Sequence, residues 1–97
     1  MSERKTGVLF LDGELIDDNV VCEVTTIKPS PYSRLRLTVD RLISSRPISW
    51  ESIIVNKRDY KLELILKEPL ITGHSKIVLM IRETDNNLPS FEVLGVQ

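Results

Sequence analysis

The chain has 97 residues, of which 41% are hydrophobic and 28% are charged, and its formal net charge is −1. A chain of this length forms one domain with a modest core, and the composition excludes an intrinsically disordered protein. The nearly neutral charge excludes the strong positive field that would by itself indicate nucleic acid or an anionic membrane surface. Cys22 is the single cysteine, so no internal disulfide can form and a cytoplasmic location is expected. No stretch approaches the roughly 18 apolar residues of a membrane helix, so we expect no membrane insertion.

The first third of the chain predicts strands. Alanine, the best helix former, does not occur, which favours sheet over helix. We expect residues 1–6 to form a polar N-terminal tail and residues 7–97 a single β domain. The apolar run TGVLFL (6–11) predicts a strand, and Asp12-Gly13 predicts a two-residue hairpin turn, because glycine readily adopts positive φ. The polar residues 17–19 indicate a second turn, and 20–28 the next strand.

The segment YSRLRLTVDRL (32–42) admits two structures. As a strand over 34–40, it directs its leucines and Val39 to one face and its arginines to the other. As a helix, it forms an apolar stripe of four side chains: Leu35, Val39, Leu42 and Ile43. The unbroken alternation favours the strand, and its interruption by the next arginine predicts a bulge or strand end near Asp40.

The second half of the chain continues this pattern. Ser49 could cap one helical turn that carries Trp50, or a strand could begin there, and the sequence leaves both open. Further strands are predicted over 60–67, 76–83 and 91–96, with a long connection over 68–75 and a polar loop over 84–90. The expected fold is therefore all-β: a small antiparallel β-sandwich or partly open barrel of six to seven short strands, with room for one short helix within 41–55.

No residue pattern predicts catalysis, a cofactor or a metal. The acidic residues around Asp17 lack the spacing of an EF-hand calcium loop and are interpreted as turn residues. His74 is the only histidine and is expected in a surface loop, because no partner residue for metal binding or base catalysis is evident. Cys22 lies in the apolar phase of its strand, which predicts a buried structural thiol. We expect neither an enzyme nor a small-molecule substrate.

Several strands are apolar on both faces, which a small domain with one interior does not require. We therefore expect a non-enzymatic protein-interaction or assembly module. It would be a subunit of an oligomer or of a larger complex, and its partner would be a second copy or another protein. Compact all-β chains of this kind occur among viral and phage structural proteins. The predicted partner surface consists of Val78, Met80, Ile65 and Leu94.

The alternative function is the binding of nucleic acid by a small β-barrel. It depends on five basic side chains: Arg34, Arg36, Lys57, Arg58 and Lys61. Such barrels bind single strands through a basic groove with aromatic residues on which bases stack. Here only 5% of the residues are aromatic and acidic residues outnumber basic ones. Ion pairs between strands explain the same arginines without a ligand, so this function is the second choice.

Overall fold

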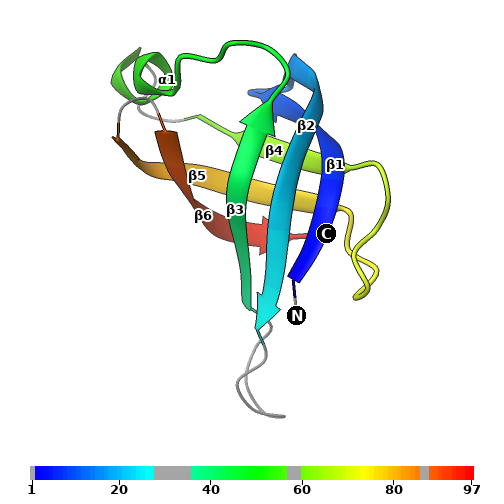
Figure 1. The fold of residues 1–97 in the computed structure, drawn as a ribbon. Helices are drawn as coiled ribbons and strands as arrows, with labels where there is room; N and C mark the ends of the chain where they lie inside the picture. The colour runs from blue at the N-terminus through cyan, green and yellow to red at the C-terminus, as the bar shows by residue number, and fades with distance from the viewer. Residues whose placement is uncertain (1, 28–35, 57–59, 86–87) are drawn as a thin grey trace.

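The computed structural model describes residues 2–27, 36–56, 60–85 and 88–97, which form one antiparallel sheet and one short helix (Figure 1). The elements in chain order are β1 (Ser2–Leu11), β2 (Glu14–Ile27), β3 (Arg36–Ser44), α1 (Trp50–Asn56), β4 (Leu62–Leu66), β5 (Lys76–Asp85) and β6 (Leu88–Val96). The sheet has six strands in the order β3-β2-β1-β4-β5-β6. These observations confirm the all-β fold that the sequence predicts, with a helix in the segment that the sequence left open.

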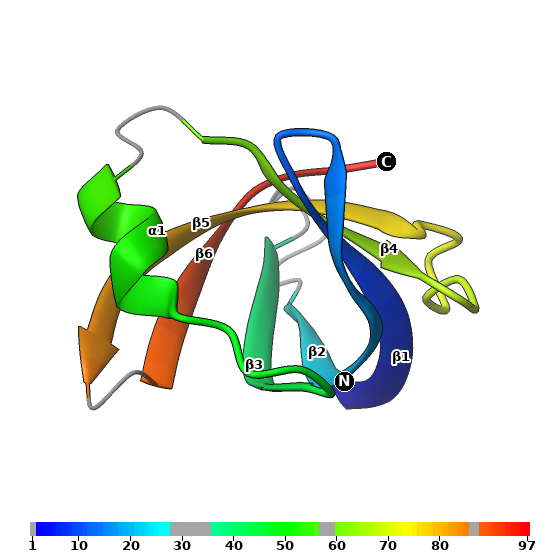
Figure 2. The same ribbon diagram turned by 90° about the horizontal axis from the view of Figure 1, so that it is seen from above.

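The sheet curls into a nearly closed barrel. Strands β1, β2 and β3 form one antiparallel meander, β4, β5 and β6 form another, and the β1–β4 ladder joins them. Figure 1 shows the first group crossing in front of the second, so their inner faces enclose the core. Strand β3 contacts β6, but the described residues form no ladder between these two edges. Helix α1 packs beside β5 at one end of the barrel (Figure 2).

The β1–β2 hairpin forms as predicted. Asp12 and Gly13 have φ values of 51° and 81°, the positive values that a type I′ turn needs. Gly7 marks the point where β1 gains a second partner, because residues before it pair with β2 alone and later ones also pair with β4. A Cβ atom on Gly7 would lie 2.7 Å from the carbonyl oxygen of Ile65, so the close approach of β4 requires glycine here.

The described part of the segment with alternating arginines and leucines is a strand, β3. Leu37 and Val39 are buried and Arg36 is exposed, which confirms the strand for the described part of that segment. Leu35 and Arg34 lie outside the described residues. The predicted irregularity is also present: the register with β2 shifts next to Arg41, whose φ is 52°. A side-chain-bearing residue with positive φ is uncommon, and here it accompanies a bulge.

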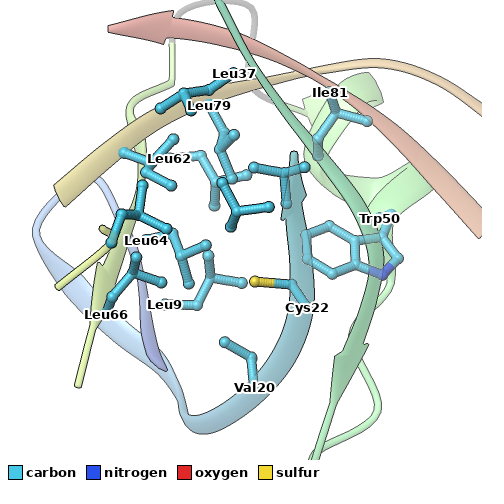
Figure 3. Close-up of a cluster of buried hydrophobic side chains, with 14 residues drawn as sticks. Leu9, Val20, Cys22, Leu37, Trp50, Leu62, Leu64, Leu66, Leu79 and Ile81 are labelled. Atoms are coloured by element: carbon cyan, nitrogen blue, oxygen red, sulfur yellow. The ribbon is translucent and has the colours of Figure 1, made fainter. Parts of the chain in front are cut away.

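The core lies between the two groups of strands and is closed at one end by α1. Figure 3 shows Leu62, Leu64 and Leu66 of β4 on one side of the cluster and Trp50 of α1 on the other. The buried apolar residues of the core are Leu9, Val20, Cys22, Val24, Leu37, Val39, Trp50, Leu62, Leu64, Leu66, Leu70, Ile77, Leu79 and Ile81. The Trp50 and Phe91 rings meet edge to face with centroids 5.4 Å apart, which fixes α1 against β6.

Three local predictions are wrong. Residues 2–6 are not a tail but the first half of β1, which pairs with β2. Its alternate side chains are exposed, while Glu3 and Lys5 contact the connection between β4 and β5. Residues 17–19 are not a turn, because β2 continues through them with a register shift opposite β1. The predicted loop over 84–90 is mostly strand, since β5 extends to Asp85 and β6 begins at Leu88. Pro89 is tolerated there because β6 is an edge strand.

Candidate functional site

Five apolar side chains share the outer face of three adjacent strands. Val8 of β1 pairs with Ile65 of β4, in a ladder whose alternate residues point into the core. Ile65 and Met80 are 38% and 37% exposed, and the other three are half-buried. Cross-strand partners lie on the same side of a sheet, so these side chains form one surface. We call this surface the outer-face patch; its residues are Val8, Phe10, Ile65, Val78 and Met80.

An ion pair lies at the centre of the outer-face patch. Glu63 pairs in register with Phe10 on one side and Val78 on the other. The Lys76 ammonium lies 2.6 Å from a Glu63 carboxylate oxygen, and that of Lys61 lies 3.8 Å from the other. The hydrogen bond from Lys76 lowers the pKa of Glu63; partial burial opposes this effect and the charges of both lysines add to it. The carboxylate is thereby neutralised locally, and apolar atoms surround it.

The structure divides the partner surface predicted from the sequence. Ile65, Val78 and Met80 belong to the outer-face patch. Leu94 is the extra residue of a bulge in β6. Gly95 pairs with Val78 and Val93 pairs with Leu79, so Leu94 has no partner in β5. It is 59% exposed and lines a different feature, the groove described next. Val8 and Phe10 were not predicted from the sequence as part of this surface, although the apolar residues on both faces of the first strand indicated an apolar outer face.

A groove of about 530 Å³ follows the open seam between the two edge strands. One wall comes from the end of β2 and the start of β3, and the other from β6 with Arg82 of β5. The lining residues are Ile27, Arg36, Leu37, Thr38, Arg82, Phe91, Glu92, Val93, Leu94, Gly95 and Val96. Its volume is in the range of pockets that hold small ligands or short peptide segments. We call it the seam groove.

The seam groove carries more positive than negative side chains. Arg36 is exposed and has no ion-pair partner among the described residues. Arg82 lies 4.0 Å from the carboxylate of Glu92, and both side chains are largely exposed, so this pair is weak. The groove is therefore lined by two arginines and one glutamate, a net positive charge that favours an anionic occupant.

The five basic residues of the nucleic-acid alternative are described only in part. Arg34, Lys57 and Arg58 lie outside the described residues. Arg36 pairs with Ile27 at the far end of β2. Lys61 instead exchanges backbone and side-chain hydrogen bonds with Asp12, next to where β2 begins. The two described members thus lie at opposite ends of β2, roughly 40 Å apart along the strand.

Asp17 is a buried carboxylate held by donors from a distant loop. The backbone N–H groups of Ser45 and Arg46 donate to Oδ2 at 2.8 and 3.1 Å. The N–H of Asn19 and the hydroxyl of Ser45 donate to Oδ1 at 2.9 and 2.6 Å. Burial raises the pKa of Asp17, but the hydrogen bonds outweigh it and hold the pKa below its ordinary value. Three of these contacts fasten the connection between β3 and α1 onto β2, and the one from Asn19 lies within β2 itself.

The remaining reactive side chains do not gather into a reaction centre in the described parts of the chain. Burial raises the pKa of the Cys22 thiol to about 11, so it stays protonated near neutrality. His74 lies in the connection between β4 and β5, where its Nδ1 is 2.7 Å from the Thr72 hydroxyl. No cluster of three or more His, Cys, Asp or Glu suited to a metal occurs among the residues described. Nor does any described helix have the length and apolarity to cross a membrane.

Comparison with protein families, with curated proteins and with solved structures finds no match to this chain. The site must therefore be interpreted from its own geometry.

Proposed function

We propose that this protein is a non-enzymatic assembly module that binds a second copy of itself through the outer-face patch. The observation that supports this function is the placement of Val8, Ile65 and Met80 on one exposed sheet face. A β-barrel of this size has its core on the inside of the sheet, so apolar side chains on the outside stay partly exposed within the monomer. Contact with another chain would remove them from water.

The ion pair at the centre of the patch favours a protein partner over nucleic acid. Glu63 and Lys76 satisfy each other, so a partner that covers this pair buries no unpaired charge, and the exposed Lys61 beside them can keep its ammonium group in water. An anionic ligand such as nucleic acid would meet the Glu63 carboxylate between these two lysines, and the patch residues themselves carry no charge. Nucleic-acid binding therefore remains the second proposal, and Arg36 in the seam groove is its strongest described residue. The single buried thiol of Cys22 fits the cytoplasmic location, which stays a prediction.

The test is the molar mass of the protein in solution, measured by light scattering across a range of concentrations. The monomer has a mass of 11.1 kDa, and the wild type should exceed it as the concentration rises. Met80→Lys should remain monomeric, because an ammonium group in an apolar interface loses its hydration even where Glu92, its cross-strand neighbour, can pair with it. Val55→Lys is the matched control: Val55 is 77% exposed on α1, outside the patch, and its replacement adds the same charge.

Salt separates the two proposals. Association through apolar side chains should change little with ionic strength, whereas binding to nucleic acid falls steeply as salt is added. A wild type that stays monomeric at every concentration would contradict self-association. Equal effects of Met80→Lys and Val55→Lys would show that the patch is not the interface. Circular dichroism of both variants checks that each retains its fold.

A further inference from the structure

We propose that the seam groove binds an extended peptide of another protein that carries acidic side chains, and that this peptide adds as a strand to the free edge of β3. This site borders the outer-face patch, since Glu92 and Gly95 of the groove pair with Met80 and Val78, but the two sites share no residue, so the inference goes beyond the proposed function. It depends on three observations. The unpaired edges of β3 and β6 border one groove, the β3 edge has unbroken register with β2 over a short run, and Arg36 and Arg82 line the groove.

An extended backbone is the natural occupant of the groove. Strands β3 and β6 are the edges of the sheet, so each has backbone N–H and C=O groups that its single neighbour does not use. A small rigid ligand cannot satisfy a row of such groups, whereas a peptide strand does so at every second residue. The volume of about 530 Å³ limits this occupant to a short segment.

Strand β3 offers the better edge for pairing. Its residues from Arg36 to Val39 pair with β2 in unbroken register, so their outward groups are evenly spaced. The β6 edge is interrupted at both ends, by Pro89, which lacks an N–H, and by the bulge at Leu94. These interruptions protect β6 from strand addition and leave it to serve as the wall on which the peptide packs.

The side chains beside this edge specify an alternating peptide. Leu37 points inward, and Phe91 and Val93 of β6 are half-buried at the groove, so alternate peptide side chains on that side should be apolar. Arg36 and Thr38 are exposed on the other face of β3, and Arg36 lacks an ion-pair partner among the described residues. The remaining peptide side chains should therefore be acidic, because a carboxylate matches the guanidinium fork.

The test uses a fluorescent, end-capped hexapeptide of alternating valine and glutamate, with a valine–lysine hexapeptide as its matched control. Fluorescence anisotropy should show saturable binding of the first peptide and none of the second. Arg36→Glu should weaken binding at least about tenfold, because an attraction becomes a repulsion. Arg4→Glu makes the same charge change at an exposed residue of β1 outside the groove and should leave affinity unchanged. Circular dichroism should show that both variants keep the wild-type fold, although Arg4→Glu lowers the midpoint of thermal unfolding somewhat because it lies opposite Glu23.

Amide hydrogen exchange then tests strand addition directly. Binding should slow exchange at alternate residues between Arg36 and Val39, which is the pattern of a new antiparallel or parallel ladder. Slowing spread evenly over the barrel would mean that the peptide merely stabilises the fold, and strand addition would be overturned.

Three further outcomes would overturn the assignment. One is no saturable binding of the acidic peptide up to about 1 mM, the weak end of specific affinity. Another is tighter binding of an oligothymidylate of about ten nucleotides at the same groove, lost in Arg36→Glu, which would assign the site to nucleic acid. A third is a change in molar mass in Arg36→Glu, which would make the groove a self-association surface. Met80 pairs with Glu92 of the groove, so the two proposals are separated by Ile65→Gln instead, because Ile65 pairs only with Val8 and Lys76, away from the groove. Failure of one proposal then leaves the other standing.

Discussion

The buried carboxylate of Asp17 should contribute strongly to the stability of the fold, and Asp17→Asn tests this. The substitution keeps the shape of the side chain and replaces one oxygen by an NH₂ group. In the less costly orientation, the amide oxygen keeps the two N–H groups of Ser45 and Arg46, and the NH₂ group turns to the Ser45 hydroxyl, which can accept. The N–H of Asn19 then faces another donor.

The expected loss of stability follows from these contacts. The N–H of Asn19 is only partly buried, so the loss of its acceptor costs an amount near the lower end of about 1–3 kcal/mol. The hydrogen bonds that survive change from charge-assisted to neutral, which weakens each of them. Together the free energy of unfolding of Asp17→Asn should fall by about 2–4 kcal/mol. The matched control is Asp18→Asn: its side chain is 61% exposed and its nearest cation, Arg46, is 3.8 Å away, so the loss should stay below about 0.5 kcal/mol.

Urea unfolding at several pH values measures both the loss and its origin. The folded protein lowers the pKa of Asp17 below the ordinary 3.8, so ionised Asp17 favours the folded state. This stabilisation is fully present above the ordinary pKa and is lost as the pH falls through the lower pKa of the folded state. The difference between wild type and Asp17→Asn should therefore shrink below about pH 4. If Asp17→Asn were as stable as Asp18→Asn at neutral pH, the structural role assigned to this carboxylate would be refuted.

Three further predictions concern the fold. Gly7→Ala should lower the free energy of unfolding by about 1–3 kcal/mol, because its Cβ would clash with the Ile65 carbonyl oxygen; a variant of unchanged thermal stability would rule out that close approach. Leu37→Ala should cost about 2–4 kcal/mol and Thr38→Ala well under about 1 kcal/mol in urea titrations; the reverse order would mean that β3 has the opposite facing. The Cys22 thiol, with a pKa of about 11, should react with a disulfide reagent at neutral pH only as fast as the protein opens; rapid labelling of the folded protein would contradict its burial.

Several features of the fold could be predicted because their causes are local. Alternation of apolar and polar residues predicted the inward leucines of β4 and the facing of Leu37, since the side-chain period of a strand is two. The Asp12-Gly13 turn was readable because positive φ at glycine is an intrinsic preference. The break in phase at Arg41 predicted the bulge that the register shift shows.

The polar segments were misread because a strand can take its partners from anywhere in the chain. Residues 17–19 have the composition of a turn, but Asp17 stays within β2 because Ser45 and Arg46 supply its donors from 28 and 29 residues away. Residues 2–6 and 84–90 have the composition of a tail and a loop. Backbone pairing nevertheless makes residues 2–6, 84–85 and 88–90 parts of strands. Backbone hydrogen bonds do not depend on side-chain polarity, so composition is a poor guide at sheet ends.

The candidate sites show the same division between sequence and tertiary structure. The sequence by itself determined an all-β chain, the inward face of most strands and a surplus of apolar residues, because periodicity and composition are properties of consecutive residues. It could not determine that the surplus on β1, β4 and β5 forms one surface, since that depends on the β1–β4 ladder, which joins residues more than 50 positions apart. Nor could it place Arg36 and Phe91 in the lining of one groove, because the seam groove exists only where the curled sheet brings its two edges together without pairing them. Long-range strand order is decided by packing of the whole core, and no short stretch of sequence contains that information.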